Sequence, residues 1–266
     1  MRIAITGKGG VGKTTLSGML ARVLAGDGKR VVAVDADPDA NLASAIGVPP
    51  EKYRDIVPVA RMKELARERT AAGGGDGSMF ILNPRVEDLP ERLSVLHEGV
   101  RLLVMGGVET GGGGCVCPEH TLVRRLMNHL LVEGDEVVIM DMEAGIEHLG
   151  RGTAESVDIL LIAVEPGLRS LQTAEQIGRL AADIGLHRIF YVGSKVTGDT
   201  DVRFLNRNLD PERILGHISM NADIREADME GGSVYDRGGT AVEEVRRLKE
   251  KLLSVVVGRN GSQVVS

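Results

Sequence analysis

A glycine-rich stretch near the start of the chain carries residues whose types and spacing predict phosphate chemistry. It follows an apolar run, opens a helical period and reads Gly7-Lys8-Gly9-Gly10-Val11-Gly12-Lys13-Thr14-Thr15. Glycines let successive backbone N–H groups turn toward phosphate oxygens, and the start of a helix adds its dipole. We therefore expect a site for ATP and ADP in which Lys13 reaches the β- and γ-phosphates and the Thr14 hydroxyl binds Mg²⁺.

Carboxylates follow two later apolar runs. Asp35, Asp37 and Asp39 lie at the end of one run, and Asp141 ends the other. A carboxylate beside the terminal phosphate can accept a hydrogen bond from an attacking water, and a carboxylate oxygen is also a ligand that suits Mg²⁺. The alternative is that these residues form turns and helix caps, and this is the favoured interpretation for Asp35 and Asp39.

The two cysteines of the chain, Cys115 and Cys117, follow the glycines Gly111–Gly114. They are too close for an ordinary disulfide. One such pair gives two thiolates, whereas closed Zn²⁺ sites and square-planar Ni²⁺ sites take four ligands. A two-fold dimer would bring four thiolates together on its axis. The alternatives are two ordinary core residues, or His120 as a third ligand, although His120 is expected in the first turn of the next helix.

Short apolar runs alternate with helical patterns along the chain. The predicted strands are Arg2–Thr6, Arg30–Val34, Arg101–Met105, Glu136–Met140, Asp158–Val164 and Arg188–Gly193. The predicted helices are Lys13–Ala25, Thr121–Val132, Leu171–Ile184 and Thr240–Val256. Strands rich in Val, Ile and Leu that are separated by helices predict an α/β fold, a mostly parallel β-sheet flanked by helices on both faces. Ligands are then expected at the carboxyl ends of the strands.

We interpret residues 1–266 as a single domain. Residues 49–92 differ from the rest because they are charged and lack a strand period. They predict an insertion with a helix at about Asp55–Arg69 and a mobile loop that contains Gly73–Gly77, and a solvated linker is the alternative. Residues 258–266 are polar and are expected to form a frayed tail.

Composition excludes several other classes of protein. The chain has a formal net charge of −6, with 3 Phe, 3 Tyr and no Trp. An acidic balance gives no electrostatic footprint for nucleic acid, and scarce aromatics argue against base stacking. No apolar run approaches the ~20 residues of a membrane span, and no hydrophobic leader precedes the first strand. We expect a cytoplasmic protein that binds neither nucleic acid nor membrane.

The phosphate loop, with Lys8 inside it, resembles the deviant Walker A motif of the nitrogenase iron protein, MinD and ParA class. This resemblance implies a P-loop ATPase in which Lys8 reaches across a dimer interface into the other subunit's nucleotide. It implies that Asp37 orients the attacking water and helps to hold Mg²⁺, and that Asp141 lies beside Mg²⁺ as in Walker B. Gly145 is similar to the glycine that senses the γ-phosphate in the second switch.

The adenine pocket departs from the pattern of this class. The class carries Asn-Lys after a late strand, and the corresponding position here is Ser194-Lys195. A proline found after a later strand is replaced by Ser219. The resemblance assigns Ser194 and Lys195 to the nucleotide site, but these departures leave the contacts with the base open.

The combination of motifs is more specific than any one of them. The phosphate loop, the segment Asp141–Gly152, Cys-Val-Cys-Pro at 115–118 and Asn83–Val86 together resemble the CooC family of nickel ATPases. Membership implies an ATP-dependent homodimer that holds Ni²⁺ or Zn²⁺ through Cys115 and Cys117. It also implies a nickel enzyme as client, either carbon monoxide dehydrogenase or acetyl-CoA synthase.

Two other functions fit parts of the pattern. A partition or positioning ATPase that resembles ParA or MinD would need a basic face or a membrane-targeting terminal helix. The segment Val245–Val257 is amphipathic, although packing against the sheet explains it equally well. An iron–sulfur reductase that resembles the nitrogenase iron protein is less favoured, because that class uses well-separated cysteines.

Overall fold

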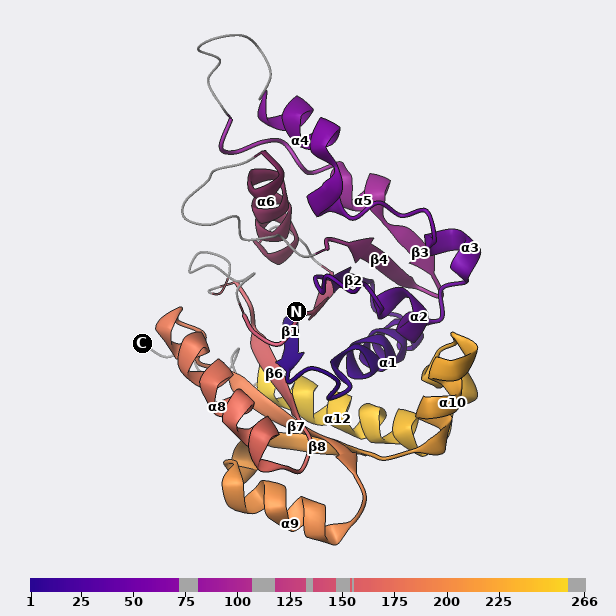
Figure 1. Cartoon of the computed structure of the whole chain (residues 1–266), viewed down its shortest axis with the longest axis vertical. Coiled ribbons are helices and arrows are strands. Elements are labelled where there is room, and N and C mark those ends of the chain that lie inside the picture. Colours follow the sequence, from indigo (N-terminus) through magenta and orange to yellow (C-terminus); the bar gives the residue numbers. More distant parts are fainter. Residues whose placement is uncertain (72–80, 107–117, 133–135, 147–153, 155, 258–266) are drawn as a thin grey trace.

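A computed structural model describes residues 1–71, 81–106, 118–132, 136–146, 154 and 156–257 (Figure 1). The strands are β1 (Arg2–Gly7), β2 (Val31–Asp35), β3 (Val95–His97), β4 (Val100–Val104), β5 (Val137–Asp141), β6 (Ile159–Val164), β7 (Ile189–Val196) and β8 (Ile214–Ser219). They form one sheet in the order β3-β4-β2-β5-β1-β6-β7-β8. The β3–β4 pair is antiparallel and the other pairs are parallel, which confirms the predicted fold class.

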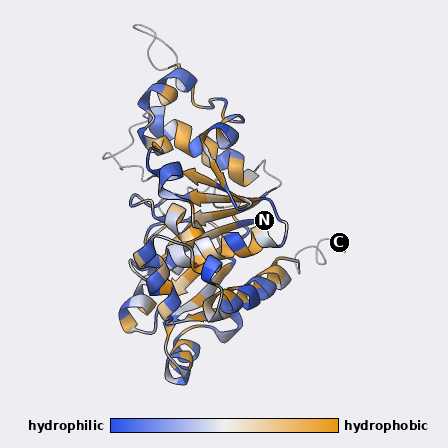
Figure 2. Cartoon of the chain, turned by 90° about the vertical axis from the view of Figure 1, so that its right-hand side faces the viewer, coloured by the Kyte–Doolittle hydropathy of each residue, from blue (hydrophilic) through white to orange (hydrophobic). Residues whose placement is uncertain are grey.

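Alternation along the strands divides the buried side chains between two hydrophobic clusters, one on each face of the sheet. Ile3 and Ile5 of β1 face one cluster, and Ala4 faces the other. Such a period of two is what a sheet covered on both sides requires. In Figure 2 the hydrophobic colours gather in the strands at the centre of the molecule.

The helices on one face are α1 (Lys13–Gly26), α2 (Leu42–Ile46), α10 (Ala222–Glu230), α11 (Val234–Arg237) and α12 (Thr240–Val257). Those on the other face are α4 (Lys63–Thr70), α5 (Leu89–Leu93), α6 (Pro118–Val132), α8 (Leu168–Asp183) and α9 (Asp199–Asn208). On α12, Val245, Leu248 and Leu252 are buried in the cluster of the first face. Packing on the sheet therefore accounts for the apolar side of this helix.

Gly18 lets α1 and α2 approach each other closely. A Cβ atom built at Gly18 would lie 2.7 Å from backbone atoms of Ala45 in α2. Separations this short do not occur, so a larger residue at position 18 would force the helices apart. The contact fixes α2 beside the start of α1, where the phosphate loop ends.

The predicted strands all appear with small shifts at their ends, and the predicted helices are extended by up to three residues. The sequence interpretation missed β3, β8, α2, α9 and α10. β3 has three residues, and β8 carries Gly216 and His217 within a short apolar run, so neither gives a clear alternation. The missed helices are likewise short or strongly charged.

The helix predicted at Asp55–Arg69 is wrong in extent. The structure gives α3 (Pro50–Tyr53), the 3-10 turn η1 (Val59–Arg61) and α4, with a break before η1 at Pro58. Proline removes a backbone donor and disfavours helical geometry in the residue before it. The loop predicted around Gly73–Gly77 and the tail 258–266 lie outside the described residues.

The region from 49 to 92 contributes to the main hydrophobic core. Val59, Ala66, Val86 and Leu89 are buried in the cluster that also holds Leu122 of α6.

Within the described parts of the chain, no helix is long and apolar enough to cross a membrane.

Candidate nucleotide site

Positive φ angles shape the phosphate loop between β1 and α1. Gly10 has φ 73° and Gly12 has φ 95°, and Gly12 is the residue that caps α1. At Gly7, with φ 148°, an added Cβ would lie 2.5 Å from the carbonyl oxygen of Ala163 in the neighbouring strand. The glycines are thus needed both for backbone conformation and for the close approach of β6.

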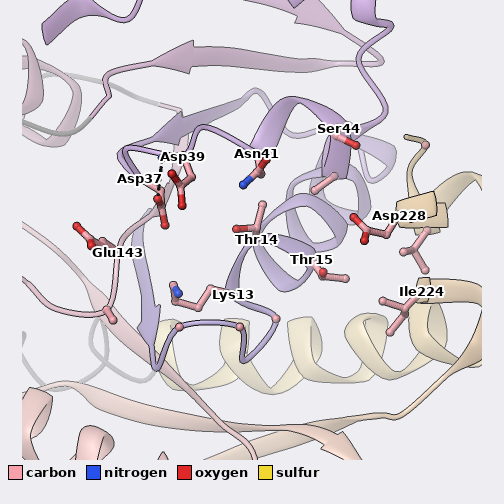
Figure 3. Close-up of a pocket in the computed structure, with 17 residues that line it drawn as sticks. Lys13, Thr14, Thr15, Asp37, Asp39, Asn41, Ser44, Glu143, Ile224 and Asp228 are labelled. Carbon is pink, nitrogen blue, oxygen red and sulfur yellow. Dashed lines mark hydrogen bonds between the residues drawn. The ribbon is translucent and has the colours of Figure 1, made fainter. Parts of the chain in front are cut away.

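A cavity of about 540 Å³ opens over this loop (Figure 3). Its walls come from the loop and α1, from the segment after β2, from the segment after β5, and from α10 and α11. The lining residues include Gly9, Gly10, Gly12, Lys13, Thr14, Thr15, Asp37, Asp39, Asn41, Ser44, Glu143, Ile224, Asp228 and Val234. The carboxyl ends of the strands therefore meet the start of α1 at one concave site, as expected for this sheet type.

Lys13 lines the cavity, whereas Asp141 is buried outside the lining and interacts with Thr14, which does line it. We refer to Lys13, Asp141 and the neighbouring Ser17 as the buried floor of the site. Lys13 and Asp141 are 7% and 1% exposed, and the Ser17 hydroxyl lies 3.0 Å from Asp141 Oδ1. Burial raises the pKa of Asp141 to about 6, while the Thr14 and Ser17 hydroxyls and the Lys13 charge act in the opposite direction. Oδ2 of Asp141 is buried without a hydrogen-bond partner among the described residues. An oxygen in this state fits a Mg²⁺ ion or a water bound to one.

The three aspartates after β2 have different environments. Asp35 is fully buried and accepts hydrogen bonds from the backbone N–H groups of Leu42, at 2.9 Å, and of Asp37, at 3.2 Å. It thus positions the turn and the start of α2. Asp37 and Asp39 both line the cavity, and Asp37 Oδ1 accepts from the Asp39 N–H at 3.0 Å.

Asp35 also lies next to Asp141, since β2 and β5 pair with these two residues in register. Burial is the main cause that raises the pKa of Asp35 to about 7, and the nearby Asp141 and Asp37 charges add to it. Two adjacent buried carboxylates favour positive charge nearby, of which Lys13 supplies a part and Mg²⁺ would supply the rest.

Gly145 is tied to the strand that precedes the phosphate loop. The Thr6 hydroxyl at the end of β1 lies 2.9 Å from the Gly145 carbonyl and 3.0 Å from that of Glu143. It also lies 3.3 Å from the Gly145 N–H, from which it can accept. The segment after β5 is therefore linked directly to the loop that would hold the phosphates.

Ser194 and Lys195 contact the phosphate loop and are absent from the lining of the cavity. Ser194 is buried and its hydroxyl donates to the Val11 carbonyl at 2.6 Å. Lys195, with φ 56°, donates from Nζ to the Gly10 carbonyl at 2.6 Å. Both therefore hold carbonyl groups of the phosphate loop.

Lys8 and Lys195 share a single carboxylate. Lys8 Nζ is 3.3 Å from Glu165 Oε1, and Lys195 Nζ is 3.7 Å from Glu165 Oε2. Lys8 belongs to the phosphate loop but is absent from the cavity lining. The same holds for the other predicted residues Gly7, Val11, Asp141, Gly145, Ser194 and Lys195.

The far end of the cavity is formed by residues that the sequence interpretation did not name. Ile224 and Asp228 of α10 face Thr15 and Ser44 across the cavity in Figure 3.

Ser219, which stands where the class carries proline, is bound to Glu244 through its N–H at 2.9 Å and its hydroxyl at 3.0 Å. Its hydroxyl is thus occupied within the fold.

The predicted metal pair, Cys115 and Cys117, lies outside the described residues. Among the residues that the structure does describe, no group of His, Cys, Asp and Glu could hold a metal ion through three or more side chains. His120, in the first turn of α6, is exposed.

Comparisons with known proteins agree with this geometry. Residues 3–234 match the CobQ/CobB/MinD/ParA nucleotide binding domain family. The chain is 52% identical over 256 residues to the carbon monoxide dehydrogenase accessory protein CooC of Rhodospirillum rubrum, with 96% of this chain and 97% of that protein covered. The chain belongs to this nucleotide-binding family and is of the CooC type.

Other relatives share the family and the fold. An uncharacterized ATP-binding protein of Methanocaldococcus jannaschii is 40% identical over 252 residues, with 93% of this chain and 96% of that protein covered. In the solved MinC:MinD complex of Aquifex aeolicus, one chain superposes with a TM-score of 0.66 at 20% identity, over 95% of both chains. A ParA family ATPase of Chlorobium tepidum gives 0.67 at 18% identity, over 94% of this chain and 97% of that one.

Sequence reasoning missed Thr6, Ser17 and Glu165. A partial signal existed for each. Ser17 is four residues after Lys13 and so lies on the same side of α1. Thr6 directly precedes the phosphate loop, and Glu165 follows the apolar run of β6 where parallel strands present their ligands.

Proposed function

We propose that this CooC-type chain is a Mg²⁺-dependent ATPase that works as a homodimer and delivers nickel to carbon monoxide dehydrogenase or acetyl-CoA synthase. The observation that carries the ATPase part is the buried floor of Lys13, Asp141 and Ser17 under a glycine-rich loop. The client is proposed from the printed name of the R. rubrum relative. Residues Gly7–Thr15 supply the phosphate cradle.

The residues of the floor bind the phosphates and hold the charge in place. Backbone N–H groups of the loop and the Lys13 ammonium bind the β- and γ-phosphates. Thr14 and Asp141 would hold Mg²⁺, and Asp37 contributes from the facing segment. When bound, Mg²⁺ neutralises charge on the phosphate oxygens.

Asp37 is proposed to orient the attacking water. It is half-buried and lines the cavity opposite Lys13, with Asp39 held against it by a backbone hydrogen bond (Figure 3). A carboxylate in this place accepts a hydrogen bond from an O–H group of the water and leaves a lone pair of the water oxygen free to attack the γ-phosphate. Gly145, tied to Thr6, is proposed to report loss of the γ-phosphate to the segment that follows it.

We place the base at the α10 end of the cavity. Ser194 and Ser219, the two positions where this chain departs from the class, both use their hydroxyls inside the fold. Ile224 and Asp228 instead line the α10 end of the cavity. Ile224 offers an apolar face for the base, and the Asp228 carboxylate offers an acceptor for an exocyclic amino group. Ser194 and Lys195 then act on the nucleotide through the phosphate loop.

The cargo is proposed to bind through Cys115 and Cys117 of both subunits. Four thiolates on a two-fold axis complete a site for Ni²⁺ or Zn²⁺ that a single chain leaves incomplete. ATP binding favours the dimer and so creates the site, and hydrolysis releases the metal to the client.

Equilibrium dialysis against Ni²⁺ tests this function directly. The reduced protein is dialysed with a non-hydrolysable ATP analogue, and bound metal is counted per protomer. We expect about one ion per two chains, as the dimer symmetry predicts. The variant with Cys115→Ser and Cys117→Ser should lose this binding and keep its affinity for nucleotide. Tight nickel binding by the double variant would contradict the proposed metal site.

A further inference from the structure

Lys8 is held inside its own chain by an ion pair. Its Nζ lies 3.3 Å from Glu165 Oε1, and the side chains of Lys8 and Glu165 are 36% and 31% exposed. Lys195 pairs with the other oxygen of the same carboxylate at 3.7 Å, so Glu165 forms ion pairs with two lysines at the edge of the phosphate loop. The proposed chemistry gives Glu165 no role.

Glu165 is the fixed member of this pair. It directly follows β6, whose Ala163 pairs in register with Gly7 of the phosphate loop. Its backbone N–H donates to the hydroxyl of buried Ser170 at 3.1 Å. Lys8, by contrast, is joined to the loop through a flexible side chain of four carbons and moves at lower cost.

We propose that Glu165 restrains Lys8 in the separate subunit and releases it when two copies of the chain pair. This step rests on the proposed function, in which Lys8 reaches the nucleotide of a second copy. The Lys8 ammonium cannot lie against the Glu165 carboxylate and against a phosphate of the partner at the same time. The paired form of Lys8 is therefore the form that is not competent for dimerisation.

The expected effect is modest, because a half-exposed ion pair contributes little and is screened by salt. The apparent affinity of two subunits for each other falls in proportion to the fraction of each subunit in which Lys8 is free. If Lys8 is free in about one subunit in three, a two-fold dimer loses about threefold in affinity for each of its two subunits. The restraint then weakens dimerisation by about tenfold, which adjusts the protein concentration at which subunits pair without preventing it.

The test compares Glu165→Gln with the wild-type chain in sedimentation equilibrium with a non-hydrolysable ATP analogue. Gln keeps the size of the side chain and removes its charge. We expect the dissociation constant of the dimer to fall by about tenfold, and the difference to narrow at high salt. Glu175→Gln is the matched control, since Glu175 lies on α8 in an exposed pair with Arg179, and it should behave as wild type.

A double-mutant comparison separates this inference from the proposed function. Lys8→Ala should weaken dimerisation, and Lys8→Ala with Glu165→Gln should match Lys8→Ala alone, because the restraint then has no target. If Glu165→Gln dimerises as wild type, or more weakly, while Lys8→Ala is impaired, the restraint is overturned and the proposed function stands. If Lys8→Ala itself dimerises and hydrolyses ATP as wild type, the role of Lys8 across the interface fails first.

Discussion

Two groups of charged residues border the same phosphate loop and differ in their access to water. The interior group is Lys13, Asp35 and Asp141, of which none is more than 7% exposed. The rim group is Lys8, Glu165 and Lys195, whose side chains are between 31% and 44% exposed. Removal from water raises the pKa values of the interior carboxyls Asp35 and Asp141, whereas the ion pairs of the rim are weak and sensitive to salt.

This difference suggests a division of labour. In the proposed function, the interior group would bind the phosphates and Mg²⁺ and so control hydrolysis. The rim group would control pairing of two subunits, since weak contacts open and close at little cost.

The largest effect is expected for Lys13→Ala, with Lys8→Ala as its counterpart from the rim. Removing the interior lysine should lower kcat/KM for ATP by about 10²–10³-fold at every protein concentration, because a buried phosphate contact is lost. Removing the rim lysine should give a loss that depends on protein concentration. Phosphate release measured over a dilution series separates the two. An activity of Lys13→Ala within a few fold of wild type would contradict the assignment.

Asp141→Asn should reduce turnover by about 10²-fold at saturating Mg²⁺. The substitution keeps the shape of the side chain but removes the charge beside the unpartnered Oδ2. Titration of activity with Mg²⁺ is the measurement, and the concentration for half activity should rise. Asp39→Asn is the control from the same cavity and should stay close to wild type. Equal losses in both variants would mean that burial does not distinguish the two carboxylates.

Ser17→Ala should lower turnover by about tenfold, since one hydrogen bond to a charged group is worth about 1.5 kcal/mol. The hydroxyl lies 3.0 Å from Asp141 Oδ1 and 2.9 Å from the Lys13 carbonyl. The same titration with Mg²⁺ should show weaker metal dependence. Ser254→Ala removes a hydroxyl that also bonds back to its own helix, at an exposed position, and should leave activity unchanged.

The smallest effect concerns stability against pH in the absence of nucleotide and Mg²⁺. Burial raises the pKa of Asp35 to about 7 and that of Asp141 to about 6. A raised pKa of an acid means that the folded state favours the protonated form. The contribution of these two carboxyls to the free energy of unfolding is then fully present below about pH 4 and is lost as pH rises through about 7.

Asp35→Asn should remove most of the Asp35 share of this loss between pH 5 and 8, measured by denaturant unfolding. Asp88→Asn is the control, because the pKa of Asp88 is shifted in the direction opposite to that of Asp35. Ion pairs with Arg69 and Arg92 lower the pKa of Asp88, so its contribution is lost only as pH falls below the range of the experiment. An unchanged slope in Asp35→Asn would show that the interior carboxylates are solvated.

Much of the site could be predicted because its signals are local. The loop from Gly7 to Thr15 specifies its conformation through glycines and a following helix, and it appears as expected. Asp37 and Asp141 follow apolar strands, and parallel strands present such residues at one edge. The apolar strands rich in Val, Ile and Leu, separated by helical patterns, likewise predicted the mostly parallel sheet and its two layers of helices.

What the sequence could not show are the partners of these residues. Ser17 meets Asp141 over a separation of 124 residues, and Lys8 meets Glu165 over 157. Ser194, expected at the nucleotide, instead bonds to the Val11 carbonyl over 183 residues.

The sequence by itself determined that this chain forms a parallel α/β sheet with a phosphate loop and carboxylates at one edge. The reason is that glycine conformations, helix starts and strand alternation depend on neighbours in the chain. Only the tertiary structure decided which groups are buried and which share a partner. Strand order brings β6 and β7 beside the loop, and this placement makes Lys13 an interior residue and leaves Lys8 at the rim.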